Sequence, residues 1–139
     1  MSVRFEKIRY QELNGRQQET YNFQKVSAVL AEFGYLTIRL TDDWNGADFI
    51  AQHFQTKEFL KVQLKGRLSF YKKYCEKDLY ICFNDSGTWY FYPHDEVLEQ
   101  VLKLGLLAGT ASWDVHSGYS FPGIPSHLKE ILAPYRLTA

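Results

Sequence analysis

Apolar residues recur every three or four positions between residues 17 and 33, which is the spacing of one buried face of an α-helix. Gly34 follows at the point where a residue in the left-handed conformation commonly ends a helix. Residues 35–40 are rich in apolar and β-branched side chains and predict a strand. After its first residues, the chain is therefore expected to form a helix and then a strand.

Further strands are predicted up to residue 92. The polar stretch 41–46 contains turn-forming residues and the apolar run 47–51 follows it, a pattern that predicts a turn between two strands. Residues 59–65 alternate between an apolar face and a polar face, and the polar face carries Lys61, Gln63 and Lys65. Beyond these, we expect a short helix over 69–77 and two strands over 79–83 and 88–92, joined by a turn.

The last third of the chain begins with a second long helix. Pro93 suits the first turn of this helix, and its apolar positions continue to near Gly105. The segment His94-Asp95-Glu96 is expected to place acidic side chains in the first turn, where the helix dipole favours them. Later residues lose the periodicity and are rich in glycine and proline. We expect a single domain of residues 1–139, with a core of about 14–105 and a packed aromatic tail over 106–139 that contains a short helix near 126–132.

Composition favours an ordinary globular protein. The chain has 139 residues, of which 45% are hydrophobic and 17% aromatic, which is enough to fill one core. Its formal net charge is zero, so any surface that binds nucleic acid must be local. No apolar run approaches the roughly 18 residues of a membrane span, and the first residues do not resemble a signal peptide. We therefore expect a cytoplasmic protein without a membrane partner.

The two cysteines, Cys75 and Cys82, do not have the spacing of a zinc site or of a disulfide framework. We expect both to be reduced thiols with a structural role.

Charge is distributed unevenly along the chain. Residues 57–77 contain seven lysine or arginine residues against two glutamates, whereas residues 85–99 contain four acidic residues and no lysine or arginine. The basic stretch is interleaved with Phe70, Tyr71 and Tyr74, which suits contact with a phosphate backbone. A solvated charged face is the ordinary alternative interpretation.

The most specific pattern joins two of the predicted strands. Asp48 lies inside an apolar strand, where a carboxylate is costly unless a positive group meets it. If strands 47–51 and 59–65 pair antiparallel, Asp48 faces Gln63 and Lys65 across the sheet. A carboxylate, an amide oxygen and an ammonium would then surround one point. Taken singly, Asp48 is also explained as a turn carboxylate, and Gln63 and Lys65 as the solvent face of a strand.

In the order of these elements and residues, the sequence resembles the PD-(D/E)XK nuclease superfamily. The resemblance covers about residues 14–92 and is closest to the Holliday-junction-resolvase and group I intron homing-endonuclease branches, where a Gly and a Glu open the first helix. Gly15 and Glu19 match those two positions. The resemblance implies a mixed α/β (α+β) fold with a restriction-endonuclease-like core.

The resemblance also implies a role for each matching residue. Asp48 would bind a divalent metal, Gln63 would occupy the position of a second acidic ligand, and Lys65 would be the catalytic lysine. Glu19 would be an accessory carboxylate, although a solvated or capping role is equally ordinary for it. With the backbone carbonyl of Leu64, these oxygens suit Mg²⁺ or Mn²⁺, and such a cation can activate water and neutralise the transition state of phosphodiester hydrolysis. Because most members carry Glu at the position of Gln63, we expect weaker metal binding here.

The expected function is a metal-dependent DNA endonuclease that acts on duplex or branched DNA. A symmetric homodimer would help it to cut both strands, and the tail around Trp113, Tyr119 and Phe121 is a candidate interface. The neutral Gln63 favours an alternative, a nuclease-fold module that binds DNA or regulates without cutting. A protein-interaction domain unrelated to nucleic acid is a third interpretation. The basic residues expected to contact the DNA backbone are Lys61, Arg67, Lys72 and Lys73.

Overall fold

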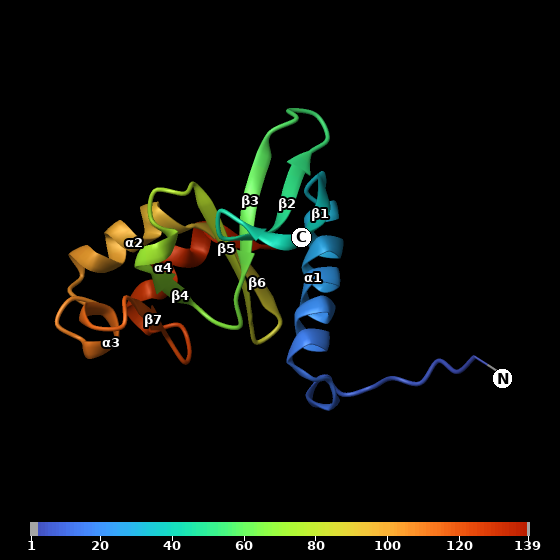
Figure 1. Ribbon diagram of the computed structural model, residues 1–139, viewed down its shortest axis with the longest axis horizontal. Helices are drawn as coiled ribbons and strands as arrows, with labels where there is room; N and C mark the ends of the chain where they lie inside the picture. The colour runs from blue at the N-terminus through green and yellow to red at the C-terminus, as the bar shows by residue number, and fades with distance from the viewer. Residues whose placement is uncertain (1–2, 139) are drawn as a thin grey trace.

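The computed structural model describes residues 3–138, with a long helix at one side of a mixed sheet and shorter helices at the other (Figure 1). The α-helices are α1 (Gly15–Ala31), α2 (His94–Lys103), α3 (Ala111–Asp114) and α4 (Lys129–Leu132). The strands are β1 (Tyr35–Trp44), β2 (Ala47–His53), β3 (Phe59–Leu64), β4 (Ser69–Tyr71), β5 (Leu79–Asp85), β6 (Thr88–Pro93), β7 (Gly118–Ser120) and β8 (Arg136–Leu137). Short 3₁₀ helices are η1 (Tyr10–Glu12), η2 (Lys72–Tyr74), η3 (Ser126–Leu128) and η4 (Ala133–Tyr135).

The larger sheet has six strands in the order β1-β2-β3-β5-β6-β8. Its first three strands form an antiparallel meander, in which Phe49 of β2 pairs with Val62 of β3. β5 then lies parallel to β3, and the remaining neighbours are antiparallel. The mixed α+β fold expected from the sequence is confirmed, with a mostly antiparallel sheet and the Asp-bearing strand in the middle of the meander.

Helix α1 covers one face of the meander. Its start is fixed by Asn14, whose side chain accepts a hydrogen bond from the backbone N–H of Gln17 over 2.9 Å, an arrangement that satisfies a free N–H at a helix start. Val26 and Leu30 are buried against the sheet, in a cluster that also includes Phe49. The predicted helix over 17–33 is confirmed, beginning two residues earlier and ending at Ala31.

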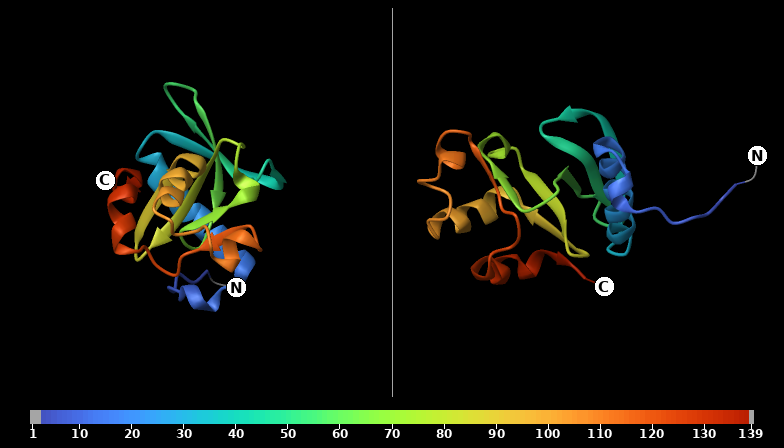
Figure 2. Two further views of the ribbon diagram at one scale, coloured as in Figure 1. Left: turned by 90° about the vertical axis from the view of Figure 1, so that its left-hand side faces the viewer. Right: turned by 90° about the horizontal axis from the view of Figure 1, so that it is seen from below.

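A second core lies on the other side of the sheet, at the end of the molecule away from α1 (Figure 2). Helix α2 contributes Val97 and Val101 to it. Trp113 and Phe121 of the tail are also buried there, with 7% and 6% of their surfaces exposed. The expected use of these two rings as a dimer interface is therefore wrong, because they fill the core of their own chain.

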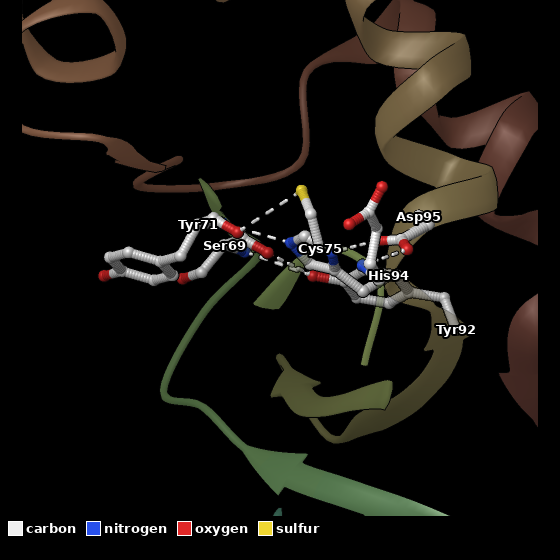
Figure 3. Close-up of polar contacts among 7 residues, drawn as sticks. Ser69, Tyr71, Cys75, Tyr92, His94 and Asp95 are labelled. Carbon is white, nitrogen blue, oxygen red and sulfur yellow. Dashed lines mark hydrogen bonds and ion pairs between the residues drawn. The ribbon is translucent and has the colours of Figure 1, made fainter. Parts of the chain in front are cut away.

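The segment that links β3 to β5 differs from its prediction. Parallel strands need a crossover connection, and the predicted helix over 69–77 is here the short strand β4 followed by η2. β4 pairs with β7 of the tail, where Tyr71 lies opposite Gly118. Two side chains near the start of α2 hold β4 in place, since Tyr92 Oη donates to the carbonyl of Ser69 over 2.6 Å and His94 Nε2 accepts from the N–H of Tyr71 over 3.1 Å (Figure 3).

The turn expected over 41–46 is shorter in the structure. Strand β1 continues to Trp44, and only Asn45 and Gly46 form the turn, with φ angles of 52° and 85°. Such a two-residue turn with positive φ matches the twist of the strands that it joins. The other elements are found near their predicted positions, including the short helices near 126–132. Among the described residues, no helix has the length and apolar character needed to cross a membrane.

Candidate active site

Asp48 is tied to strand β3 by a hydrogen bond to the backbone. The carboxylate oxygen Oδ2 of Asp48 accepts from the N–H of Leu64 over 2.8 Å. One residue beyond the pair formed by Phe49 and Val62, the antiparallel register brings Asp48 level with Gln63. The structure therefore places the half-buried Asp48 beside the Gln63-Leu64-Lys65 segment, as the sequence pattern predicts.

Asp48 and Glu19 line the same cavity, of about 650 Å³, between α1 and the β1–β2 hairpin. Arg39 of β1 lines it too, and its Nη2 atom lies 3.5 Å from Oε1 of Glu19. The guanidinium also donates to Thr20 Oγ1 over 2.7 Å. No local sequence signal marks Arg39, because its contact with Glu19 depends on how α1 packs against β1. The cavity thus holds two carboxylates, one of which is already paired with an arginine.

Lys65 continues from β3 and places its ammonium over two aromatic rings. Its Nζ atom lies 4.7 Å from the ring centroid of Tyr71 and 5.4 Å from that of Tyr74. Lys73 uses the same rings, at 5.5 Å and 5.3 Å. The negative faces of aromatic rings attract cations, so these tyrosines hold two positive charges close to the end of β3.

A smaller cavity, of about 180 Å³, connects the expected residues. It is lined by Glu19, Leu64 and Lys65, so it shares Glu19 with the cavity that Asp48 lines. Gln63 lies on β3 opposite Ile81 of β5 and is half-buried. The structure therefore places Asp48, Glu19, Leu64 and Lys65 along two cavities that meet at Glu19. Gln63 lines neither cavity, and the ammonium of Lys65 lies over the tyrosines.

The expected DNA-contacting residues are spread over β3 and the crossover segment. The Nζ atom of Lys61 lies 5.9 Å from the ring of Trp44, and that of Lys72 lies 5.1 Å from the ring of Trp113. Arg67 is exposed beside a cavity that Asn84 also lines. No salt bridge within residues 3–138 includes any of the lysines or arginines of this set. Their charges are available to a polyanion.

The residues of the Asp48 cavity fit a divalent cation in chemical type. Carboxylate, amide and carbonyl oxygens are the ligands that Mg²⁺ and Mn²⁺ prefer. Asp48 and Glu19 supply carboxylates at one cavity, and one oxygen of Asp48 is used by Leu64. A cation that binds Glu19 would compete with Arg39 for this carboxylate or bind its second oxygen.

A second cluster of potential metal ligands lies at the start of α2 (Figure 3). One ligand atom each from Cys75, His94 and Asp95 falls within 4.8 Å of the others. His94 is fully buried. Because His94 Nε2 accepts from the backbone N–H of Tyr71, the proton of the neutral ring lies on Nδ1, which is 2.9 Å from Asp95 Oδ1.

This pattern argues for a structural role rather than a metal site. A metal on Nδ1 of His94 would move the ring proton to Nε2, where it would meet the N–H of Tyr71. The other carboxylate oxygen of Asp95 accepts from the N–H of Glu76 over 2.8 Å. Burial lowers the pKa of His94, although Asp95 opposes this shift. The first turn predicted from His94-Asp95-Glu96 is found, but its bond to β4 was not foreseen.

Comparisons with known proteins add little to this geometry. No protein-family model matches the chain, and no curated protein matches it. Among solved structures, one match is Hjc of Archaeoglobus fulgidus, a Holliday junction resolvase from an archaeal hyperthermophile. The match has a TM-score of 0.44 and 19% sequence identity, and it covers 53% of this chain and 70% of the other. At that similarity, the activity and substrate of this chain must be argued from its own residues.

Proposed function

We propose that this protein is a metal-dependent DNA endonuclease with its active site at the end of β3. The observation that carries the proposal is the hydrogen bond from the N–H of Leu64 to Asp48 Oδ2. This bond fixes a carboxylate against the Gln63-Leu64-Lys65 segment, beside the cavity shared with Glu19. The site thereby combines hard oxygen ligands with a lysine, as hydrolysis of a phosphodiester requires.

In this proposal, Asp48, Glu19, the side-chain oxygen of Gln63 and the carbonyl of Leu64 hold Mg²⁺ or Mn²⁺. The ion would supply charge neutralisation and an activated water. Lys65 positions the scissile phosphate or the attacking water, with its ammonium oriented by the rings of Tyr71 and Tyr74. The partner is DNA, whose backbone would be bound by the half-buried Lys61 and the exposed Arg67, Lys72 and Lys73.

Two observations favour the alternative, a DNA-binding module that does not cut. The carboxylate of Glu19 is occupied by Arg39, and Gln63 contributes no charge to the ligand set. Such a module would keep the basic surface and lose the ion. The two functions differ in one measurable property, namely whether a divalent ion produces strand cleavage.

The decisive experiment measures cleavage of supercoiled plasmid, linear duplex and a four-way junction with Mg²⁺ or Mn²⁺. Asp48→Asn keeps an oxygen that accepts from the N–H of Leu64 while removing the charge, so its fold should be preserved. Asp48→Asn and Lys65→Ala should each lower the cleavage rate by about a hundredfold or more. Glu130→Gln and Lys129→Ala, both exposed on α4, are the matched controls and should cut normally.

Two results would refute the nuclease proposal. One is a wild-type protein that binds DNA in a salt-dependent manner and cuts none of the three substrates, which would establish the binding module. The other is metal-dependent cleavage that survives in both Asp48→Asn and Lys65→Ala, which would indicate a different site. A homodimer that cuts both strands remains part of the proposal, and sedimentation over a concentration series tests it.

A further inference from the structure

We propose that the cavity between α1, the Gly66 bend and the β5–β6 hairpin binds an unpaired nucleobase. The cavity has a volume of about 500 Å³, within the ordinary range of small-molecule sites. Lys65, the lysine of the proposed active site, also lines this cavity. The inference therefore rests on the proposed function and adds to it a feature of the substrate. It predicts that the DNA substrate carries unpaired nucleotides, as bulged or flapped DNA does.

The lining of this cavity combines the chemical groups that single-stranded nucleic acid needs. Aromatic rings provide stacking surfaces for bases, lysines bind phosphates, and amides bond to base edges. These three kinds of group are present together, as the rings of Tyr10, Tyr21 and Trp89, the ammonium group of Lys25 and the amide of Asn22. Lys65 also lines the cavity, although its ammonium lies over Tyr71 and Tyr74.

Tyr10 is held against α1 at the surface rather than in the core. The side-chain amide of Asn22 donates to its hydroxyl over 2.8 Å, and the amide of Gln18 donates to its carbonyl over 3.3 Å. Its ring meets that of Tyr21 edge to face, with centroids 5.3 Å apart. With 36% of its surface exposed, Tyr10 keeps part of its side chain accessible to a ligand. It forms an oriented wall of the cavity, available for stacking.

Trp89 presents an unused donor. Only 7% of its surface is exposed, and no hydrogen bond within residues 3–138 includes its indole N–H. Every fully buried side-chain nitrogen or oxygen in that part of the chain is hydrogen-bonded. The indole N–H is therefore not fully enclosed, and Trp89 is one of the residues that line this cavity. A carbonyl oxygen or ring nitrogen of a nucleobase would satisfy it.

Lys25 brings a positive charge that has no acidic partner. Its Nζ atom lies 5.3 Å from the ring of Tyr21, and it takes part in none of the ion pairs found among the described residues. A phosphate could bind the ammonium of Lys25 without displacing a carboxylate. The charge of the cavity lining thus favours an anionic ligand, such as a nucleotide, over a neutral or basic peptide of similar size.

The cavity lies next to the proposed active site. The smaller cavity lined by Glu19 and Leu64 shares Tyr10, Asn22 and Lys65 with it. A nucleotide whose base stacks on the ring of Tyr10 or Tyr21 would therefore lie next to the phosphate at the proposed metal site. In paired DNA the base is stacked within the duplex, so only an unpaired nucleotide can occupy the cavity without an unstacking cost.

The test measures binding without divalent ions, so that it does not depend on cleavage. Two duplexes of the same sequence are compared, one fully paired and one with a single-nucleotide bulge of 2-aminopurine, whose fluorescence reports stacking. Tyr21→Leu keeps apolar volume and removes the stacking ring. It should weaken binding of the bulged duplex by about tenfold and leave the paired duplex unchanged. Lys25→Met should weaken binding of the bulged duplex more than binding of the paired one.

The matched control is Phe59→Leu, which changes an exposed ring on β3 and should affect neither duplex. The inference is overturned if Tyr21→Leu weakens both duplexes equally or neither. It is also overturned if 2-aminopurine fluorescence in the bulge does not change on binding. These outcomes are separable from the nuclease proposal. If the protein prefers the bulged duplex through Tyr21 but never cuts DNA, the nuclease proposal is refuted and the nucleobase site is supported. If it cuts DNA with a divalent ion but shows no such preference, the nuclease proposal is supported and the nucleobase site is refuted.

Discussion

His94 Nε2 and the backbone N–H of Tyr71 are 3.1 Å apart, in a hydrogen bond that joins the start of α2 to strand β4. The ring of Tyr71 lies beneath the ammonium of Lys65. A buried imidazole therefore supports one of the two rings that orient the proposed catalytic lysine. The bond exists only while Nε2 is unprotonated, because a protonated nitrogen cannot accept.

The first prediction is that mild acid destabilises the fold through His94. Burial lowers the pKa of His94 below its ordinary 6.5, so below that pH the unfolded chain binds a proton that the folded chain does not. Stability is therefore fully present above 6.5 and falls as the pH decreases, by at most about 1.4 kcal/mol per pH unit, until the folded-state pKa is reached. Urea unfolding over this pH range measures the slope.

His94→Gln should remove most of this pH dependence while lowering stability at neutral pH. His127→Gln, which changes an exposed imidazole in η3, is the control and should keep the wild-type slope. An unchanged slope in His94→Gln would show that another group titrates.

The second prediction concerns Gly118, which lies flat against the ring of Tyr71. A methyl group at Gly118 would overlap that ring, so Gly118→Ala must displace Tyr71 or open the β4–β7 pair. We expect a loss of about 1–3 kcal/mol in the free energy of unfolding, measured by thermal or urea denaturation. Gly123→Ala lies in the same tail with open space around it and should change stability little. Equal effects of the two substitutions would contradict the close contact between Gly118 and the ring of Tyr71.

The third prediction is that the two thiols react slowly and in a fixed order. Burial raises the pKa of Cys82, which is fully buried. Burial also raises the pKa of the half-buried Cys75, and the nearby carboxylates of Asp95 and Glu76 raise it further. Because the thiolate is the reactive form, iodoacetamide should label Cys75 slowly and Cys82 only after unfolding.

Peptide mass spectrometry over a time course follows both sites. Asp95→Asn should accelerate labelling of Cys75 by a few fold, whereas Glu130→Gln on α4 should not. Labelling of Cys82 before Cys75 in the native protein would contradict the burial found for them.

The elements that the sequence predicted well are those whose signal is local. The apolar period that predicted α1 buries Val26 and Leu30, and the alternation in β3 places Val62 in the core. The position of Asp48 beside the Gln63-Leu64-Lys65 segment also followed, because it depends only on adjacent antiparallel strands and their register.

The features that the sequence did not reveal depend on distant partners. Ser69–Tyr71 is a strand because β7 pairs with it, and no property of residues 69–77 signals that partner. The Glu19–Arg39 ion pair and the His94–Tyr71 bond likewise join separate elements. The sequence makes the aromatic tail around Trp113, Tyr119 and Phe121 a candidate interface, yet Trp113 and Phe121 are buried in the core of their own chain. Single-domain organisation and cytoplasmic location remain predictions.

The fourth prediction is that Arg39 limits metal affinity at the proposed site. Its guanidinium pairs with Glu19 across 3.5 Å and lines the cavity of Asp48, so a divalent ion must compete with it for Glu19 and also approach against its charge. Arg39→Met should therefore raise the affinity for Mn²⁺ by about three- to tenfold. Isothermal titration calorimetry of the metal alone measures this change without reference to cleavage.

Arg136→Met, at an exposed arginine of β8, removes the same charge away from the cavity and should leave the Mn²⁺ affinity unchanged. Glu19→Gln should weaken binding, and the double variant Glu19→Gln with Arg39→Met should bind more weakly than Arg39→Met alone, because the carboxylate that the arginine releases would be missing. If Arg39→Met bound Mn²⁺ less tightly than the wild type, the guanidinium would be organising Glu19 for the metal rather than competing for it. The ion pair would then be part of the assembled site.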